Sequence, residues 1–131
     1  MTRTVRLGIA LATCALIAAI PTVAAAPASG PTATASRACG LGDKERRTFP
    51  PATYVNSISV RNVSCRKGKR VTRAFHACRR SHGGANGRCP NRVQRFRCRE
   101  TRSGVPGVQY NGRVVCRRGG KKVVSTYTQN V

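Results

Sequence analysis

The stretch VSCRKGKRVTRAFHACRR, residues Val63–Arg80, predicts one amphipathic basic helix. Ser64 is suited to cap its first turn, and Gly83-Gly84 is suited to end it. The apolar side chains recur at helical spacing on one stripe, which Gly68 extends by a turn: Val71, Ala74, Phe75 and Cys78. One face must therefore pack against another element. The opposite face presents positive charge to solvent, through Arg66, Lys69, Arg70, Arg73 and Arg80.

The N-terminal residues have the pattern of an export signal. Arg3 and Arg6 precede an apolar run of about 14 residues, which suits a signal peptide and is short for a membrane span of about 20. Small residues offer cleavage sites after Ala25 or Ala28. The sequence therefore predicts a signal peptide at 1–25, a flexible Pro/Ser/Thr-rich leader at 26–38, and a disulfide-stapled basic domain at 39–131.

The cysteines indicate an oxidising, extracellular location. One of the seven, Cys14, lies in the apolar run and leaves with the signal. An even number in a short exported chain predicts three disulfides, formed by Cys39, Cys65, Cys78, Cys89, Cys98 and Cys116. The chain has no Trp and only three Phe and three Tyr, so its apolar core is thin. Bridges worth about 2–4 kcal/mol each then supply much of its stability.

Geometry restricts the pairing of these cysteines. Cys65 and Cys78 lie at opposite ends of the helix, about 20 Å apart, whereas a disulfide needs Cα atoms within about 7 Å. Cys78 can meet Cys89 across the Gly-rich turn, so this pair is favoured. Cys65 is then expected to pair with Cys98 or Cys116, and Cys39 with whichever of these two remains.

β-Branched residues predict strands at Val55–Val63 and Val93–Glu100. The second strand has Phe96 and Cys98 on one face, and its other face is basic, with Arg95, Arg97 and Arg99. The intervening segments are interpreted as loops or turns: Gly40–Thr53, Ser81–Asn91 and Thr101–Gly107.

Two dipeptides predict hairpin turns near the C-terminus. Asn111-Gly112 is one strong hairpin signal. Gly119-Gly120 is the other, and it folds Arg113–Tyr127 so that Cys116 pairs with Val123 and Val114 with Ser125. The face that the helix covers then holds Val114, Cys116, Val123 and Tyr127. The predicted fold is α+β, with one amphipathic helix packed on a small antiparallel sheet and three disulfides as staples.

Charge is the strongest functional signal. The chain has 25 Lys and Arg against three acidic residues, and loss of Arg3 and Arg6 changes the net charge from +22 to +20. Arg presents a planar donor fork that suits phosphate. We therefore expect a secreted, non-catalytic, monomeric protein that contacts anionic polymers with low specificity: cell-wall polymer, nucleic acid or anionic lipid head groups. The expected contacts are Arg66, Lys69, Arg70, Arg73, Arg80, Arg95, Arg97 and Arg99. The alternative is that the charges only keep a small domain solvated.

Few residues could support catalysis or metal binding. A ribonuclease would use His76 and His82, or Glu100, as acid and base. The helical register instead places His76 on the basic face, exposed to solvent. A zinc site at His76, Cys78 and Cys89 lacks the usual close cysteine pair. We expect no catalytic residue, no metal and no cofactor.

Two further functions compete with polymer binding. A secreted protease inhibitor would expose one rigid, disulfide-anchored loop, for which Ser81–Arg88 is the candidate. A cationic antimicrobial protein would need an apolar helix face free for membranes, whereas here the core requires that stripe.

The order of motifs resembles small exported cysteine-containing proteins of actinobacteria, whose function is unknown. The similarity rests on Asn62–Cys65, the basic helix, Phe96–Cys98 and Val115–Val124, and covers roughly residues 55 to 127. It implies a secreted, disulfide-stapled α+β protein and no catalytic residue.

Overall fold

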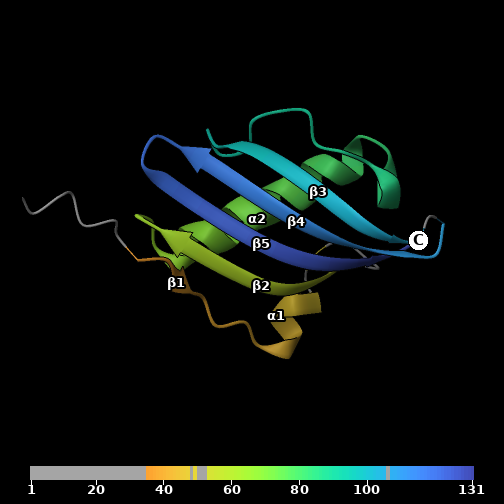
Figure 1. Ribbon diagram of the computed structural model, residues 1–131, viewed down its shortest axis with the longest axis horizontal. Coiled ribbons are helices and arrows are strands. Elements are labelled where there is room, and N and C mark those ends of the chain that lie inside the picture. The colour runs from red at the N-terminus through yellow and green to blue at the C-terminus, as the bar shows by residue number, and fades with distance from the viewer. Residues whose placement is uncertain (1–34, 48, 50–52, 106) are drawn as a thin grey trace, which may run out of the picture. The chain divides into compact units, whose positions relative to one another are not determined.

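The computed structural model describes residues 35–47, 49, 53–105 and 107–131 (Figure 1). The expected signal peptide and most of the leader lie outside these residues. The described part forms an antiparallel sheet with strand order β1-β2-β5-β4-β3. Its elements are β1 (Arg37–Ala38), α1 (Asp43–Arg47), β2 (Thr53–Arg61), α2 (Cys65–Ser81), the 3-10 turn η1 (Gly84–Asn86), β3 (Arg97–Val105), β4 (Gln109–Arg118) and β5 (Lys121–Asn130). The predicted α+β class, with one main helix on the sheet, is confirmed.

Helix α2 forms where the sequence predicts it. The Ser64 hydroxyl accepts a hydrogen bond from the Lys67 backbone N–H at 3.2 Å, and Gly83 after the helix has φ +123°. Gly68 has a packing role, because a Cβ at this position would lie 2.5 Å from Cγ1 of Val60. A glycine inside the helix therefore lets α2 approach β2 closely. None of the described helices is long and apolar enough to cross a bilayer.

The buried stripe of α2 is rotated relative to the prediction. The residues that the sheet and its connections cover are Gly68, Val71, Thr72, Phe75, His76 and Arg79. Ala74 and Cys78, which we expected on this stripe, are only half-buried. Polar residues thus occupy one flank of the face that packs against the sheet.

The C-terminal hairpin has the predicted register. Cys116 lies opposite Val123 and Val114 opposite Ser125. These four side chains are buried, as is Tyr127. They form the inner face of the sheet together with Val55, Ile58 and Val60 of β2.

The hairpin turn predicted at Asn111-Gly112 is wrong. Asn111-Gly112 lies inside β4, where Gly112 pairs with Arg102 on one side and Tyr127 on the other. A Cβ on Gly112 would lie 2.1 Å from Cε1 of Tyr127, so the buried ring needs a glycine beneath it. The chain turns instead between Val105 and Gln109.

Replacing Gly112 with alanine should therefore lower the free energy of unfolding by about 1–3 kcal/mol, as expected for overpacking a buried ring. Gly42→Ala is the matched control, because a Cβ at Gly42 meets no atom within 4 Å. Urea denaturation of both variants measures the difference. Equal stabilities would show that Tyr127 moves aside without cost.

The strand predicted at Val93–Glu100 and the turn predicted at Thr101–Gly107 need correction. β3 begins at Arg97 and continues to Val105. Gln94 and Arg95 have φ of 53° and 67° and form a tight turn, closed by backbone hydrogen bonds between Val93 and Phe96 of 3.0 and 2.7 Å. Arg95 therefore lies at a turn and not on a strand face.

The segment before β2 is more ordered than predicted. Asp43–Arg47, inside the expected loop at Gly40–Thr53, forms helix α1. Arg37 and Ala38, at the end of the expected leader, form β1 and pair with Val60 and Ser59. The sheet therefore begins two residues before the predicted domain boundary.

Three disulfides join the described cysteines. The favoured pair, Cys78–Cys89, is present with Cα atoms 5.3 Å apart. The expectation that Cys65 reaches β3 or β4 is wrong: Cys65 pairs with Cys39, and Cys98 pairs with Cys116. Cys98 lies directly opposite Cys116 in the β3–β4 ladder. The Cys39 N–H donates to the Ile58 carbonyl of β2 at 2.8 Å, and the disulfide to Cys65 joins this edge of the sheet to the first residue of α2.

Candidate functional site

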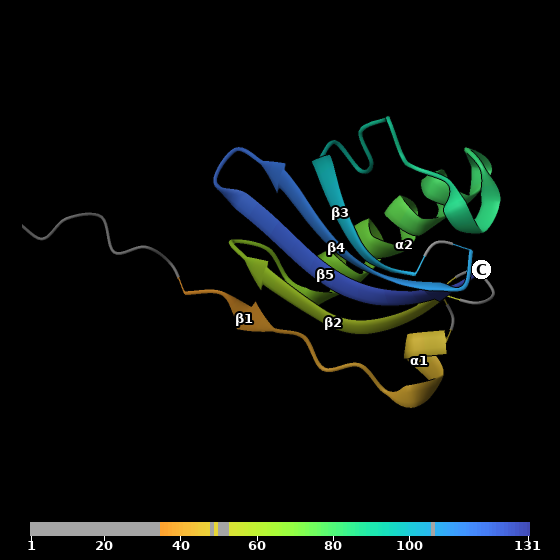
Figure 2. The ribbon, with the colours of Figure 1, turned by 45° about the vertical axis from the view of Figure 1, so that its right-hand side comes forward.

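The face of the sheet opposite α2 is open in the described structure. Figures 1 and 2 show α2 along one side of the sheet, behind β4 and β5 in Figure 1. Side chains alternate along each strand, so every second residue points away from the helix. On β3, β4 and β5 these outward side chains are exposed or half-buried, whereas on β4 and β5 the inward ones are buried from Tyr110 to Cys116 and from Val123 to Gln129.

Four cations lie side by side across this open face. Arg97 of β3 pairs with Arg117 of β4, Arg117 with Lys122 of β5, and Lys122 with Arg61 of β2. Register partners project to the same face, and neighbouring strands are about 4.8 Å apart. We call Arg97, Arg117, Lys122 and Arg61 the basic row. It spans roughly 14 Å across the sheet.

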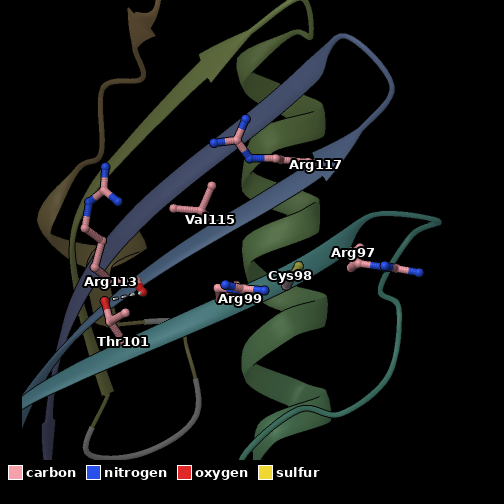
Figure 3. A pocket seen from close by; sticks show the side chains of 7 residues that line it. All are labelled: Arg97, Cys98, Arg99, Thr101, Arg113, Val115 and Arg117. Carbon is pink, nitrogen blue, oxygen red and sulfur yellow. Dashed lines mark hydrogen bonds between the residues drawn. The ribbon is translucent and has the colours of Figure 1, made fainter.

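Two more arginines extend the basic row along the strands. Arg99 pairs with Val115, and Arg113 pairs with Thr101. In Figure 3, Arg99, Arg113 and Arg117 lie around Val115, and Arg97 extends away from them. These residues line a groove of about 530 Å³ with Val115 and Cys98 as its apolar part. We call the basic row with Arg99 and Arg113 the sheet cation face.

The sheet cation face has no carboxylate partner among the described residues. The sequence contains only three acidic residues. Asp43 and Glu45 lie on α1, and Glu100 points to the inner side of β3, where its side chain is 6% exposed and pairs with Arg102 at 2.8 Å. The charge of the sheet cation face is therefore left for solvent or for a ligand.

The predicted basic face of α2 forms a second surface, the helix cation face. Its residues are exposed or half-buried: Arg66, Lys69, Arg70, Arg73 and Arg80. Glu45 of α1 neutralises part of it, since its carboxylate lies 2.7 Å from Lys69 Nζ and 3.6 Å from Arg73 Nη2. The two cation faces thus differ in their balance of charge.

The sequence missed four members of the sheet cation face: Arg61, Arg113, Arg117 and Lys122. Alternation with buried residues of β4 marks Arg113 and Arg117 as outward-facing, and this signal was present in the sequence. Arg95, which was predicted as a contact, belongs to neither face. It lies beside Gln94, which accepts a hydrogen bond from Lys67 at 2.8 Å.

The prediction that His76 is exposed is wrong. Its exposed fraction is 0%, and the rings of Phe49, Phe75 and Tyr127 surround it with centroids 4.6–5.5 Å away. Phe49, from the connection between α1 and β2, covers the flank of α2 on which His76 lies. Burial lowers the pKa of His76 to about 3, and the charges of Arg79 and Arg102 add to this effect. A substrate in solvent cannot contact this imidazole in the folded chain.

The other features considered for catalysis, metal binding or protease inhibition also form no such site in the part of the chain that the structure describes. His82 is exposed at the end of α2, where Nδ1 lies 2.8 Å from the Cys78 carbonyl oxygen. In the described part of the chain, no three His, Cys, Asp or Glu side chains are grouped as metal ligands. Within Ser81–Arg88, the proposed inhibitor loop, the Ala85 carbonyl accepts a hydrogen bond from buried Arg79. This loop is thus attached to the core through its backbone.

Comparison of the chain with protein-family models, with curated proteins and with solved structures found no match. The two cation faces are therefore the features from which a function can be argued.

Proposed function

We propose that this protein is a secreted, non-catalytic binder of linear phosphate-bearing polymers at the cell exterior. The observation that carries the proposal is the basic row, in which four cations from four strands lie in register on an open face without a carboxylate. The three disulfides support an extracellular location, because such bridges persist in oxidising compartments.

Phosphate is the anion that suits this face best. Five of the six cations are arginines, whose guanidinium groups form paired hydrogen bonds to phosphate oxygens. The half-buried Val115 lines the same groove as Arg97, Arg99, Arg113 and Arg117, and offers apolar surface for their aliphatic stems. Successive phosphates of an extended polymer can then contact cations from successive strands.

The same face predicts weak discrimination between polymers. Among the described Phe and Tyr side chains, Tyr54 is the exposed one, and it lies on β2 with the Arg46 guanidinium 6.0 Å from the centre of its ring. Aromatic stacking platforms would favour polymers that carry bases over those that do not, and the sheet cation face has no such platform. Affinity should therefore follow phosphate density and ionic strength more than sequence or sugar.

Binding should depend steeply on salt, and the slope should report the sheet cation face. For single strands, log K against log salt falls by about 0.7 per phosphate contact. The combined variant Arg97→Gln, Arg117→Gln, Lys122→Gln should thus lower the slope for fluorescent oligo(dT) by about 2. Arg66→Gln, Arg70→Gln, Arg73→Gln should also lower it, by less, because Glu45 already engages Arg73.

The matched control replaces three exposed cations outside both faces: Arg37→Gln, Lys44→Gln, Arg92→Gln. It removes the same charge and should change the slope least. Equal slopes for all three variants would mean that only net charge matters, and salt-independent binding would reject the proposal. The oligonucleotide must also be recovered intact, since cleavage by pure protein would indicate an enzyme.

A further inference from the structure

The two cation faces point in opposite directions. The inner side of the sheet packs on the buried stripe of α2, as the close approach of Gly68 to Val60 shows. The helix cation face lies on the opposite arc of α2, and the sheet cation face lies on the other side of the sheet. Figure 3 views the sheet cation face directly, with α2 behind the strands.

The two faces are also electrostatically separate. The α2 helix lies between them, and a helix with its side chains is about 10–12 Å across. Charges in physiological salt are screened over about 8 Å. A polymer strand that neutralises one face therefore leaves most of the charge on the other face available.

We propose that the protein bridges two polymer strands, one on the sheet cation face and one on the helix cation face. This inference rests on the proposed function and adds a geometry to it: the chain acts as a cross-linker of phosphate polymers. The sheet cation face binds first because its cations are uncompensated. The helix cation face binds the second strand more weakly because Glu45 pairs with Lys69 and Arg73.

A sandwich assay separates bridging from binding. Oligo(dT) on beads captures the disulfide-intact protein, the beads are washed, and fluorescent oligo(dT) is then added at low salt. The wild-type protein should retain the second oligonucleotide. The variant Arg66→Gln, Arg70→Gln, Arg73→Gln should still bind the beads and should lose most of this retention. The same sandwich assay with poly(glycerol phosphate) distinguishes nucleic acid from wall-type polymer as the source of phosphate.

A second variant changes retention in the opposite direction. Glu45→Gln removes the carboxylate that neutralises the helix cation face, so second-strand retention should rise. Asp43→Asn makes the same change of charge at an exposed position of α1 that pairs with neither Lys69 nor Arg73, and it should raise retention less.

The outcomes distinguish the two proposals. Failure to bind the beads would reject the proposed function. Binding without second-strand retention would reject bridging alone. Bridging through the helix cation face would also be overturned if the Arg66→Gln, Arg70→Gln, Arg73→Gln variant retained the second strand. Equal effects of Glu45→Gln and Asp43→Asn would overturn it too. Light scattering of the protein without polymer must show a monomer, since retention through protein self-association would contradict the two-faced mechanism.

Discussion

Replacing Arg79 with alanine is expected to lower the free energy of unfolding by about 2–4 kcal/mol, because it breaks a buried hydrogen-bond network and leaves a cavity. Arg79 is 1% exposed and lies at the end of α2. Its guanidinium donates to the Ala85 carbonyl and the Gln129 Oε1, each at 2.6 Å, and to Thr53 Oγ1 at 3.1 Å.

Aromatic rings complete the surroundings of Arg79. Its guanidinium also donates to the Tyr110 hydroxyl and lies 4.9 Å from the centre of the Tyr127 ring. No described carboxylate pairs with it, so neutral dipoles and a ring face hold this cation. Removing it takes one donor from each of several buried acceptors and leaves the space of its side chain unfilled. The Ser81–Arg88 loop then keeps its bonds to the sheet from Arg102 and Tyr110 and loses the one that joins it to the end of α2.

Urea denaturation at pH 7 tests this expectation. Arg70→Ala is the control, since Arg70 is exposed on the same helix and its loss should cost no more than about 0.5 kcal/mol. Arg79→Met should fall between the two, because it removes the charge but keeps the packing of the stem. An Arg79→Ala protein as stable as Arg70→Ala would show that water replaces the guanidinium without cost.

The parts of the fold that the sequence predicts are those with local determinants. Helix α2 depends on its own caps and periodicity, and the last hairpin depends on the two residues at its turn. The Cys78–Cys89 bridge joins residues that lie close along the chain. Each of these features can be assigned without knowledge of the rest of the molecule.

The errors arise where distant segments determine the environment. His76 lies at the border of the buried and basic arcs of α2, and Phe49 from the preceding connection decides on which side it falls. Gly112 is a strong turn residue, but the ring of Tyr127 requires it within a strand. The basic row depends on β5 inserting between β2 and β4, a pairing that the order of elements along the chain does not reveal.

Acid should destabilise the protein through His76. The pKa of His76 is about 3 in the folded chain, because it is buried and faces Arg79 and Arg102, and about 6.5 in the unfolded chain. Above pH 6.5 both states hold a neutral imidazole, so the group has no effect. As the pH falls from 6.5 toward 3, the unfolded chain binds a proton that the folded chain excludes. Stability is then lost at up to about 1.4 kcal/mol per pH unit.

The informative range is pH 6.5 to 5, in which the imidazole of His76 takes up most of its proton in the unfolded chain. The free energy of unfolding should decrease there by about 1–2 kcal/mol in the wild-type protein. His76→Phe keeps an aromatic ring among Phe49, Phe75 and Tyr127 and removes the titrating group, so its stability should be flat over this range. His82→Gln removes an exposed histidine and should retain the wild-type slope. A His76→Phe protein that loses stability as steeply as wild type would show that the imidazole is protonated in the folded state, and that its burial among the three rings does not exclude the charge.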